Sequence, residues 1–508
     1  MPDPTETPEL HSNILRPWEE HASFNDLLME QFRKAPWFLL SLAAHGVLVG
    51  LILIFPWDLI QPQQKAEVIT KMEMQPEEIF EEPEEKPPEI EEEPIEEEPV
   101  LQDALIEDVT EVPDEGDPNL ESDSPFEGDG LNDLIGLGGG AGGKYGGRFG
   151  GRGRRGGSAT EQSLLAALEW LKDHQDGDGR WDCDGFSKNC KTNICDGPGE
   201  ALHDVGVTGL ALLAFLGNGD TTRSGKYKDQ VVRAVRWLVD QQDPDSGLFG
   251  EKSGNSYLYS HSIATLALCE AYYFGRSPQL RGPAQRAVYY IQAARNPYKA
   301  WRYYEPPDGD NDTSVTGWMI FALKAAEDAG LDIDKTCYDG ALAWFDEVTD
   351  PATGRTGYQQ RGEPSSRRTG FESRFPVDKT ESLTAVSLLC RIFMGQTPEK
   401  DAILRTQADR LRRTPPTWEV TPDRSLVDAY YWYYGAFAMF QMGGEDWRIW
   451  RQALEKAIIE NQRKDGDEKG SWDPVGAWGR DGGRVYSTAI GALCLEVYFR
   501  YARVLGAR

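Results

Sequence analysis

One pattern recurs from about residue 160 to the end of the chain, and it limits the possible folds more than any other feature. In each copy, a helix with periodic apolar residues ends in Trp or Tyr, enters a turn of Gln, Asp and Gly, and closes on an aromatic residue. The strongest copies are Ala166–Trp181, Ala234–Phe249 and Ala453–Trp472, and weaker copies are Ala287–Trp301, Ala341–Tyr358 and one that ends at Trp418. Each copy precedes a second helical stretch rich in Ala, Leu and Gly. A fixed period of this kind is typical of helical repeat proteins.

The repeats predict six helix pairs, one pair for every ~50–70 residues. The first helix of each pair is amphipathic, whereas the second is apolar nearly all round, which indicates burial. Six outer helices around six buried inner helices form a closed barrel, and we find no strand pattern. We therefore predict an all-α domain, an α/α-toroid, over residues 159–508.

The helix–Gln–x–Asp–Gly–x–Trp segments resemble the QW repeats of squalene-hopene cyclases and related triterpene cyclases. By this resemblance, residues 159–508 are similar to the α/α-toroids of a superfamily that includes protein prenyltransferase β subunits and complement-type thioester domains. In physical terms, the Gln and turn amides tie one helix end to the next, and the closing Trp packs across the gap.

The N-terminal part of the chain predicts a single-pass membrane anchor. An uncharged run from Trp37 to Phe55 has ~19 residues, enough to cross a bilayer as a helix. Arg33 and Lys34 precede it, and the next base is Lys65, so residues 1–35 are expected in the cytoplasm and the C-terminal domain outside it, in the periplasm. A cleaved signal peptide is the alternative, but the run is long, starts late and lacks a small-residue cleavage site. The expected transmembrane helix covers residues 36–57 of an inner-membrane protein.

An acidic tether follows at residues 58–135, and a Gly/Arg-rich linker at 136–158. Residues 60–135 hold 27 acidic residues against 3 lysines, whereas residues 136–508 carry 49 acids against 47 bases. The net charge of -31 thus belongs mainly to a Glu/Pro-rich segment that repels itself and stays extended and disordered. Residues 136–508 are thus almost neutral, and no basic face points to nucleic acid, so we do not expect a nucleic-acid partner.

The anchor and spacer together resemble the start of TonB-type energy transducers. Ser41 and His45 lie four residues apart on one face of the expected transmembrane helix. In the family, a Ser-x-x-x-His face docks a proton-driven motor complex, so the resemblance implies such a partner in the membrane. The alternative is a neutral imidazole that is bonded within its own helix or to a neighbour. No TonB-type C-terminal domain follows, so the receptor function is not implied.

The resemblance to triterpene cyclases also implies a place to look for catalysis. These enzymes protonate an alkene or epoxide with the middle Asp of a D-x-D-D-T motif at the start of an inner helix. Here the matching stretch runs from Asp308 to Thr313, but Gly309 and Asn311 replace the first and middle Asp. Asp310 and Asp312 are the remaining candidates for a catalytic acid. The alternative is that Asp312 caps the inner helix, since Asp is a favoured N-cap residue.

Other chemistry of the superfamily is not supported by the residues. Asp334, Cys337 and Tyr338 have the wrong spacing for a prenyltransferase zinc site, and the thioester motif is absent. Cys190 and Cys195 are predicted to form a disulfide outside the cytoplasm, with Cys183 left over. Zinc ligation by this cluster with the flanking histidines is the alternative, although its spacing matches no common zinc pattern. No cofactor or metal is predicted.

The starts of the inner helices are expected to converge on one mouth of a central cavity. Mixed aromatic, acidic and basic residues around a concave apolar site are typical of a ligand pocket. The candidate cavity residues are His203, Asp204, Tyr259, His261, Trp318, Glu381, Tyr431, Tyr434, Arg484 and Tyr486. The alternative is that the aromatic residues fill the barrel and the polar groups cap helices.

Two function classes remain open from the sequence. In the first, the toroid is a non-catalytic domain that binds an apolar or isoprenoid ligand or a protein and is held away from the membrane. In the second, it is a squalene-hopene-cyclase-like isomerase with a displaced acid. The missing middle Asp favours the first class.

Overall fold

The computed structural model describes residues 159–192 and 194–500, which form twelve α-helices. The predicted anchor at 36–57, the tether at 58–135, the linker at 136–158 and the residues Ser41 and His45 lie outside the described residues. The first helices of the pairs are α3 (Ala159–Asp173), α5 (Lys228–Asp240), α7 (Arg281–Ala293), α9 (Thr336–Val348), α11 (Ala402–Arg413) and α13 (Gly444–Ile459). The second helices are α4 (Asp204–Asn218), α6 (Tyr257–Gly275), α8 (Thr313–Asp328), α10 (Ser382–Phe393), α12 (Ala429–Met442) and α14 (Gly479–Arg500).

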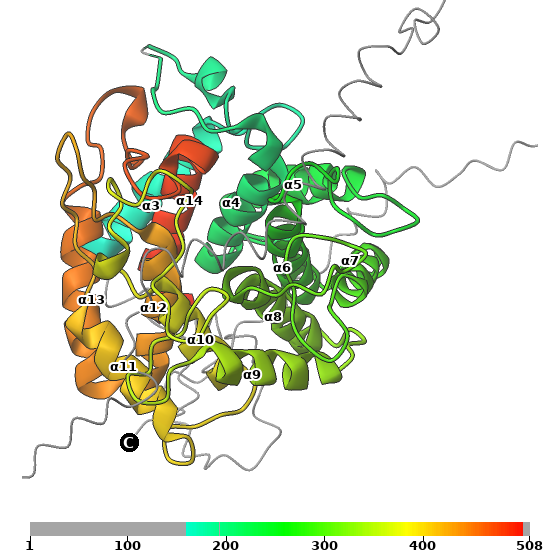
Figure 1. Ribbon diagram of the computed structural model, residues 1–508. Coiled ribbons are helices and arrows are strands. Elements are labelled where there is room, and N and C mark those ends of the chain that lie inside the picture. The colour runs from blue at the N-terminus through cyan, green and yellow to red at the C-terminus, as the bar shows by residue number, and fades with distance from the viewer. Residues whose placement is uncertain (1–158, 193, 501–508) are drawn as a thin grey trace, which may run out of the picture. The chain divides into compact units, whose positions relative to one another are not determined.

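The second helices form a closed inner ring. Each packs against the next in chain order, and α14 returns to pack against α4 (Figure 1). The first helices lie outside this ring, each against the inner helices beside it. The only strand-like pairing among the described residues is three isolated bridges. The fold is therefore the α/α-toroid of six helix pairs that the repeats predict.

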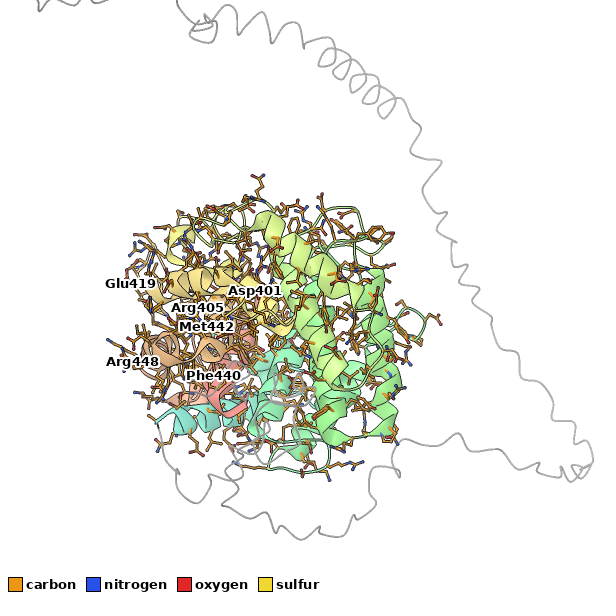
Figure 2. The ribbon with its side chains drawn as sticks, turned by 90° about the horizontal axis from the view of Figure 1, so that it is seen from below. Asp401, Arg405, Glu419, Phe440, Met442 and Arg448 are labelled. Carbon is orange, nitrogen blue, oxygen red and sulfur yellow. The ribbon has the colours of Figure 1, made fainter. Side chains whose placement is uncertain are left out.

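Burial separates the two sets of helices as the sequence pattern indicates. Every residue of α10 is buried, whereas α5 buries one apolar stripe that includes Trp237 and Leu238. On α13, Trp447 packs against Phe440 of α12 with ring centroids 5.3 Å apart, while Arg448 points outward at the edge of the domain (Figure 2). The outer helices thus cover the inner ring with one face and meet solvent with the other.

Glycine permits the inner helices to approach each other closely. A Cβ atom on Gly317 of α8 would lie 2.3 Å from Cγ1 of Val386 on α10. One on Gly435 of α12 would lie 2.3 Å from the ring of Trp450 on α13. No heavy-atom contact this short is tolerated, so these positions exclude any side chain. Gly317 therefore allows α8 to pack closely on α10, and Gly435 allows α12 to pack closely on the outer helix α13.

The repeated turns join neighbouring outer helices through glutamine. Gln175 donates from Nε2 to Gly179 O at 2.8 Å, within its own turn, and to Gln230 O in the next outer helix at 3.0 Å. Gln242 donates in the same way to Gly247 O and to Pro283 O. In these two repeats, the Gln therefore ties one outer helix to the next.

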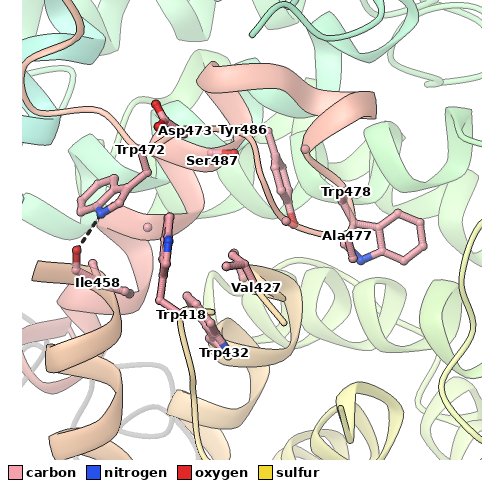
Figure 3. A pocket seen from close by; sticks show the side chains of 14 residues that line it. Trp418, Val427, Trp432, Ile458, Trp472, Asp473, Ala477, Trp478, Tyr486 and Ser487 are labelled. Carbon is pink, nitrogen blue, oxygen red and sulfur yellow. Dashed lines mark hydrogen bonds between the residues drawn. The ribbon is translucent and has the colours of Figure 1, made fainter. Parts of the chain in front are cut away.

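The closing tryptophans seal the end of their own outer helix. Trp181, Trp301 and Trp472 are buried, and each donates from Nε1 to a carbonyl near the end of that helix, at 2.7 to 2.8 Å. Figure 3 shows the bond from Trp472 to Ile458 O. The bond satisfies one of the carbonyls that a helix end leaves unpaired. The closing Trp is therefore a stabilising device.

A further contact, which the sequence pattern did not reveal, links each closing residue to the following inner helix. The backbone N–H groups of Trp181, Trp301 and Trp472 donate to the hydroxyls of threonines in α4, α8 and α14, which are Thr208, Thr316 and Thr488. In the fourth copy along the chain, the backbone N–H of Thr356 donates to Thr384 Oγ1 at 3.2 Å. Thr356 therefore holds the closing position there, and the assignment of Tyr358 as the closing aromatic is wrong.

One stretch of the described residues is long and apolar enough to span a membrane. It is Ala201–Asn218, which includes α4. Because 72% of it is buried as part of the inner ring, its apolar character is explained by the core of the toroid.

Candidate ligand cavity

The inner helix starts and the loops above them enclose a cavity of about 640 Å³. Its walls are apolar and aromatic, with serine and tyrosine hydroxyls between them. The aromatic lining residues are Tyr259, Tyr303, Trp318, Tyr358, Tyr430, Trp478 and Tyr486. The volume lies within the range of about 300–1,000 Å³ that is usual for small-molecule sites.

The floor of the cavity is a stack of aromatic rings. Trp318 of α8 lies 5.9 Å from Tyr433 and 5.3 Å from Tyr434 of α12, measured between ring centroids. Ser314 and Tyr430 join their hydroxyls at 3.0 Å in the wall above it. This packing fixes the rings in position, so their exposed faces and edges define the shape of the cavity.

Four of the ten predicted cavity residues line this space: His203, Tyr259, Trp318 and Tyr486. The other six lie elsewhere, and each has a partner that explains its position. They are Asp204, His261, Glu381, Tyr431, Tyr434 and Arg484.

Asp204 and His261 belong to the repeat turns. Asp204 accepts from Cys183 N at 2.8 Å and from Arg180 Nη1 at 3.0 Å, and burial raises its pKa to about 6. His261 accepts from Phe249 N at Nδ1 and faces Ala287 O with Nε2 at 3.1 Å, so Nε2 carries the proton. Burial lowers the pKa of His261 to about 4, which keeps the ring neutral. His261 thus takes the position that threonine holds in α4, α8, α10 and α14.

Glu381 and Arg484 are held in buried ion pairs outside the cavity. Glu381 pairs with Arg355 at 2.7 Å and with Arg410 at 2.9 Å. Arg484, whose side chain is 0% exposed, pairs with Glu468 at 3.2 Å and with Asp473 at 2.9 Å. Both side chains point away from the ring axis because their partners come from the outer loops.

The two tyrosines of α12 also serve the core. Tyr431 donates to Thr414 O at 2.8 Å and packs edge-on against Trp450 of α13. Tyr434 lies below the floor, against Trp318. For these residues the alternative from the sequence, that the aromatics fill the barrel, is correct.

Asp312 lies behind the cavity wall and caps α8. Its Oδ1 accepts from Val315 N at 2.7 Å, and its Oδ2 accepts from the hydroxyl of Tyr358 at 3.1 Å. The side chain is completely buried and is not part of the cavity lining. Burial raises the pKa of Asp312 to about 7, so the carboxyl is partly protonated at neutral pH. The capping role that the sequence offered as the alternative is confirmed.

Asp310 points away from the cavity. Its carboxylate pairs with Arg302 at 2.5 Å, and the side chain is 62% exposed. Asn311, at the position of the expected acid, accepts from Ala300 N at 2.9 Å and holds the turn. The structure therefore places neither Asp310 nor Asn311 where a ligand in the cavity would meet it.

The rim of the cavity carries its charged groups. Arg368 pairs with Glu200 at 3.2 Å and with Asp481 at 2.7 Å, and His203 lies beside them. Burial lowers the pKa of His203 and raises that of Asp481. Glu200, His203 and Asp481 converge as metal ligands can, but the guanidinium of Arg368 already neutralises both carboxylates. The rim is better suited to hydrogen-bond a polar group.

Several lining residues were missed from the sequence because they lie on loops. Tyr303 and Tyr358 each follow a closing residue by two positions, and their hydroxyls contact each other. Arg367 reaches the cavity from the long loop before α10 and pairs with Asp428 at 2.7 Å. The spacing of Tyr303 and Tyr358 after their closing residues was the one signal that pointed to them.

A second aromatic cleft, around Trp418, Trp432, Trp472 and Trp478, is not a ligand site (Figure 3). Its free volume is about 20 Å³, which is room for one water molecule. Trp418 packs against Trp432 in this cleft, with ring centroids 6.0 Å apart.

The predicted disulfide remains a prediction. Cys190 and Cys195 are free cysteines in the structure, with sulfurs 3.0 Å apart, and His174 lies beside both. Cys183 is separate from them and buried, and burial raises its pKa well above the usual range. None of the three is therefore placed as a nucleophile for a ligand in the cavity.

Comparison with known proteins adds similarity of the overall structure only. No family model and no curated protein matches the chain. An alpha-amylase from Clostridium perfringens has a TM-score of 0.45 and 11% identity, over 68% of this chain and 99% of its own. An alpha-1,6-mannanase from Salegentibacter sp. in complex with alpha-1,6-mannotetrose has a TM-score of 0.46 and 10% identity, over 68% and 99%. The type II terpene cyclase MstE from Scytonema in complex with merosterolic acid A has a TM-score of 0.44 and 12% identity, over 67% and 97%.

These similarities carry no argument about activity. The class of the domain follows from its own ring of helices: it is an α/α-toroid. Its distinguishing feature is an aromatic central cavity with a charged rim.

Proposed function

We propose that the toroid is a ligand-binding domain whose cavity takes a small molecule with an apolar body and a polar end. The observation that carries the proposal is the separation of groups in the lining. Aromatic and aliphatic side chains with hydroxyls form the wall, and the charged groups lie at the rim and on its loops. Burial of an apolar body against such a wall supplies affinity, while the few polar groups fix orientation.

The acidic side chains that line the cavity are consistent with a non-catalytic role. Among the described lining residues, the carboxylates are Glu200 and Asp481, and both are paired with Arg368. A cyclase needs a carboxylic acid that faces a dry, apolar part of its substrate. Neither of these acids meets that requirement, since both pair with an arginine at the open end of the cavity.

A cyclase-like isomerase is the second candidate, favoured by one observation. Asp312 is a buried carboxyl with a raised pKa, and it is bonded to Tyr358, which lines the cavity. In that case the proton would pass from the hydroxyl of Tyr358 to an alkene carbon, and Asp312 would return a proton to Tyr358. A phenol is a weak acid for this task, which is why we rank the enzyme second.

The proposal includes the predicted anchor. The transmembrane helix at 36–57 would hold the toroid on the periplasmic side of the inner membrane, at the end of the acidic tether. Ser41 and His45 would dock a proton-driven motor complex of the TonB-partner type.

Labelling of single cysteines in intact cells tests the topology. Protection of residues after 160 from an impermeant reagent would contradict it.

Binding is tested by filling the cavity. Ser314 lines the wall at the first turn of α8, so Ser314→Trp places a large ring where the ligand would lie. Ser253, which is exposed and outside the lining, provides the matched control Ser253→Trp. The full chain in lipid nanodiscs is titrated with geranylgeraniol, oleic acid and maltotriose, and native mass spectrometry counts bound molecules.

We expect the two apolar probes to bind the wild-type chain and the Ser253→Trp control. We expect Ser314→Trp to weaken this binding by about tenfold or more, equivalent to about 1.4 kcal/mol. Binding of maltotriose alone would contradict the proposed ligand class. Equal binding to both variants would show that the cavity is not the site.

A further inference from the structure

A second site lies away from the cavity, at the end of α3. It consists of three side chains, His174, Cys190 and Cys195, which we call the His–Cys cluster. His174 follows the last turn of α3, and the two cysteines come from the loop at residues 182–200 that leads to the rim of the cavity. The three ligand atoms all lie within 4.8 Å of one another.

The spacing of these atoms is close to that of a tetrahedral metal site. His174 Nε2 lies 3.5 Å from Cys190 Sγ and 3.6 Å from Cys195 Sγ, and the sulfurs are 3.0 Å apart. Around a tetrahedral zinc ion, the usual bond lengths place nitrogen and sulfur about 3.5 Å apart and two sulfurs about 3.8 Å apart. Both nitrogen–sulfur distances fit, and a movement of one sulfur by less than about 1 Å completes the arrangement.

The orientation of His174 is set by the other nitrogen of its ring. Nδ1 lies 2.8 Å from Trp170 O, and because a carbonyl only accepts, Nδ1 carries the proton. The ring also stacks on Trp170, with centroids 4.1 Å apart and an interplanar angle of 20°. Nε2 is thus left with its lone pair directed at the two sulfurs. A hydrogen bond of this kind from the far nitrogen is typical of metal-binding histidines.

The loop supports the sulfurs in a similar way. Cys195 N donates to Cys190 Sγ at 3.2 Å, a bond that favours a negatively charged sulfur. Asp467 accepts from the N–H groups of Lys191 and Thr192 at 2.8 and 2.6 Å and so holds the segment between the cysteines. A disulfide would use only the two sulfurs and would give His174 Nε2 no role.

The fourth position of a tetrahedral site would face a cleft of about 440 Å³. His174, Cys190 and Asp467 lie among its lining residues. A water molecule can complete the coordination from this side.

We propose that the His–Cys cluster binds a zinc ion through His174, Cys190 and Cys195, and that the ion fixes the loop at 182–200 to the end of α3. The same loop carries Glu200 to the rim, where Glu200 N donates to Asp481 O at 2.8 Å. The ion would thus hold this loop in place, and it would connect metal content with the shape of the cavity entrance. The ion replaces the thiol protons, since zinc binds the thiolate form.

The test measures zinc in the full chain, purified from its own compartment without chelators. We expect about one zinc ion per chain in the wild type and a loss to less than about a tenth of that in Cys190→Ser and Cys195→Ser. Cys183→Ser is the matched control, because Cys183 belongs to the same loop but not to the cluster. It should keep its zinc.

A second measurement avoids any folding defect of the variants. The wild-type chain is stripped with a chelator and then given cobalt(II), which should produce an absorption band from thiolate-to-metal charge transfer. In the native chain, Cys190 and Cys195 should react with an alkylating reagent only after the metal is removed. Digestion without reductant should yield the two cysteines in separate peptides. Absence of zinc together with a Cys190–Cys195 disulfide peptide overturns the proposal, as does absence of the cobalt band.

Discussion

Gln462 and Ser163 lie 299 residues apart in the chain but are bonded to each other twice. Gln462 Nε2 donates to Ser163 O at 2.7 Å, and Ser163 Oγ donates to Gln462 Oε1 at 2.7 Å. The same Nε2 also donates to Gly470 O within its own turn at 2.8 Å. This is the tie between neighbouring outer helices, here used between α13 and α3, the last and the first. The contact that joins neighbouring outer helices along the chain therefore also joins the last outer helix to the first and closes the ring.

Gln462→Ala should destabilise the toroid through loss of this tie. Three hydrogen bonds disappear, each worth about 1 kcal/mol, and partial access to water offsets some of the loss, so we expect about 2 kcal/mol. The midpoint of thermal unfolding, followed by circular dichroism, should fall. Gln452→Ala, at an exposed position on α13, is the control and should stay within about 0.5 kcal/mol of the wild type. Equal midpoints for the two variants would show that the tie is not needed.

His261→Thr tests whether this histidine is a structural replacement for threonine. The folded pKa of about 4 lies below the ordinary value of 6.5, so the unfolded chain binds more protons between these pH values. Stability contributed by His261 is therefore present above about pH 6.5 and is lost as the pH falls toward about 4. The variant lacks this titration, so the advantage of the wild type should shrink by on the order of 2 kcal/mol over that window. A stability difference that does not change with pH would contradict the assignment.

The repeats predicted the architecture because its determinants are local. Six apolar second helices, the Gln and closing Trp of the repeats that have them, and the cap at Asp312 can each be identified from a short stretch of about 20 residues, and the structure confirms them. In the weaker copy Ala341–Tyr358 the prediction was wrong: Thr356, not Tyr358, takes the closing position, because its N–H donates to Thr384.

The lining of the cavity was only partly predictable, since it depends on the rotation of each inner helix and on distant partners. Arg484 reads as a cavity residue in the sequence, but its guanidinium also pairs with Asp196, 288 residues away. Glu381 likewise turns to Arg410 of α11. Such partners come from loops and from a neighbouring outer helix, and the repeat does not determine which side chains they present. Tyr303 and Arg367 were missed because they lie on loops.

Burial of the ionised Asp312 carboxyl lowers the free energy of unfolding, and this loss grows as the pH rises. Asp312→Asn should remove it. The folded pKa of about 7 lies above the ordinary value of 3.8, so the folded state binds more protons in this window. Wild-type stability due to this group therefore falls as the pH rises from about 4 to 7. Asn caps nearly as well as Asp, so at pH 4 the two proteins should differ by less than about 1 kcal/mol, and the variant should gain relative to the wild type toward pH 7. Denaturation curves at several pH values measure this change.

The control for that experiment is Asp310→Asn. Asp310 is exposed and belongs to the same turn, so its variant should follow the wild type at every pH. If Asp310→Asn gained stability toward pH 7 and Asp312→Asn did not, the assignment of the buried titrating group would be wrong.

The last prediction concerns catalysis and follows from where the acids lie. A triterpene cyclase must present a carboxylic acid directly to the substrate, but here Asn311 fills the expected position, Asp310 faces solvent and Asp312 is separated from the cavity by Tyr358. We therefore expect the full chain to release no cyclised product from squalene or its epoxide, as measured by gas chromatography and mass spectrometry. If a polycyclic product does form, loss of that product in both Tyr358→Phe and Asp312→Asn, but not in Asp310→Asn, would assign the proton path to Asp312 and Tyr358. That result would replace the binding role with the enzyme, because Asp312→Asn keeps the cap and leaves the fold intact.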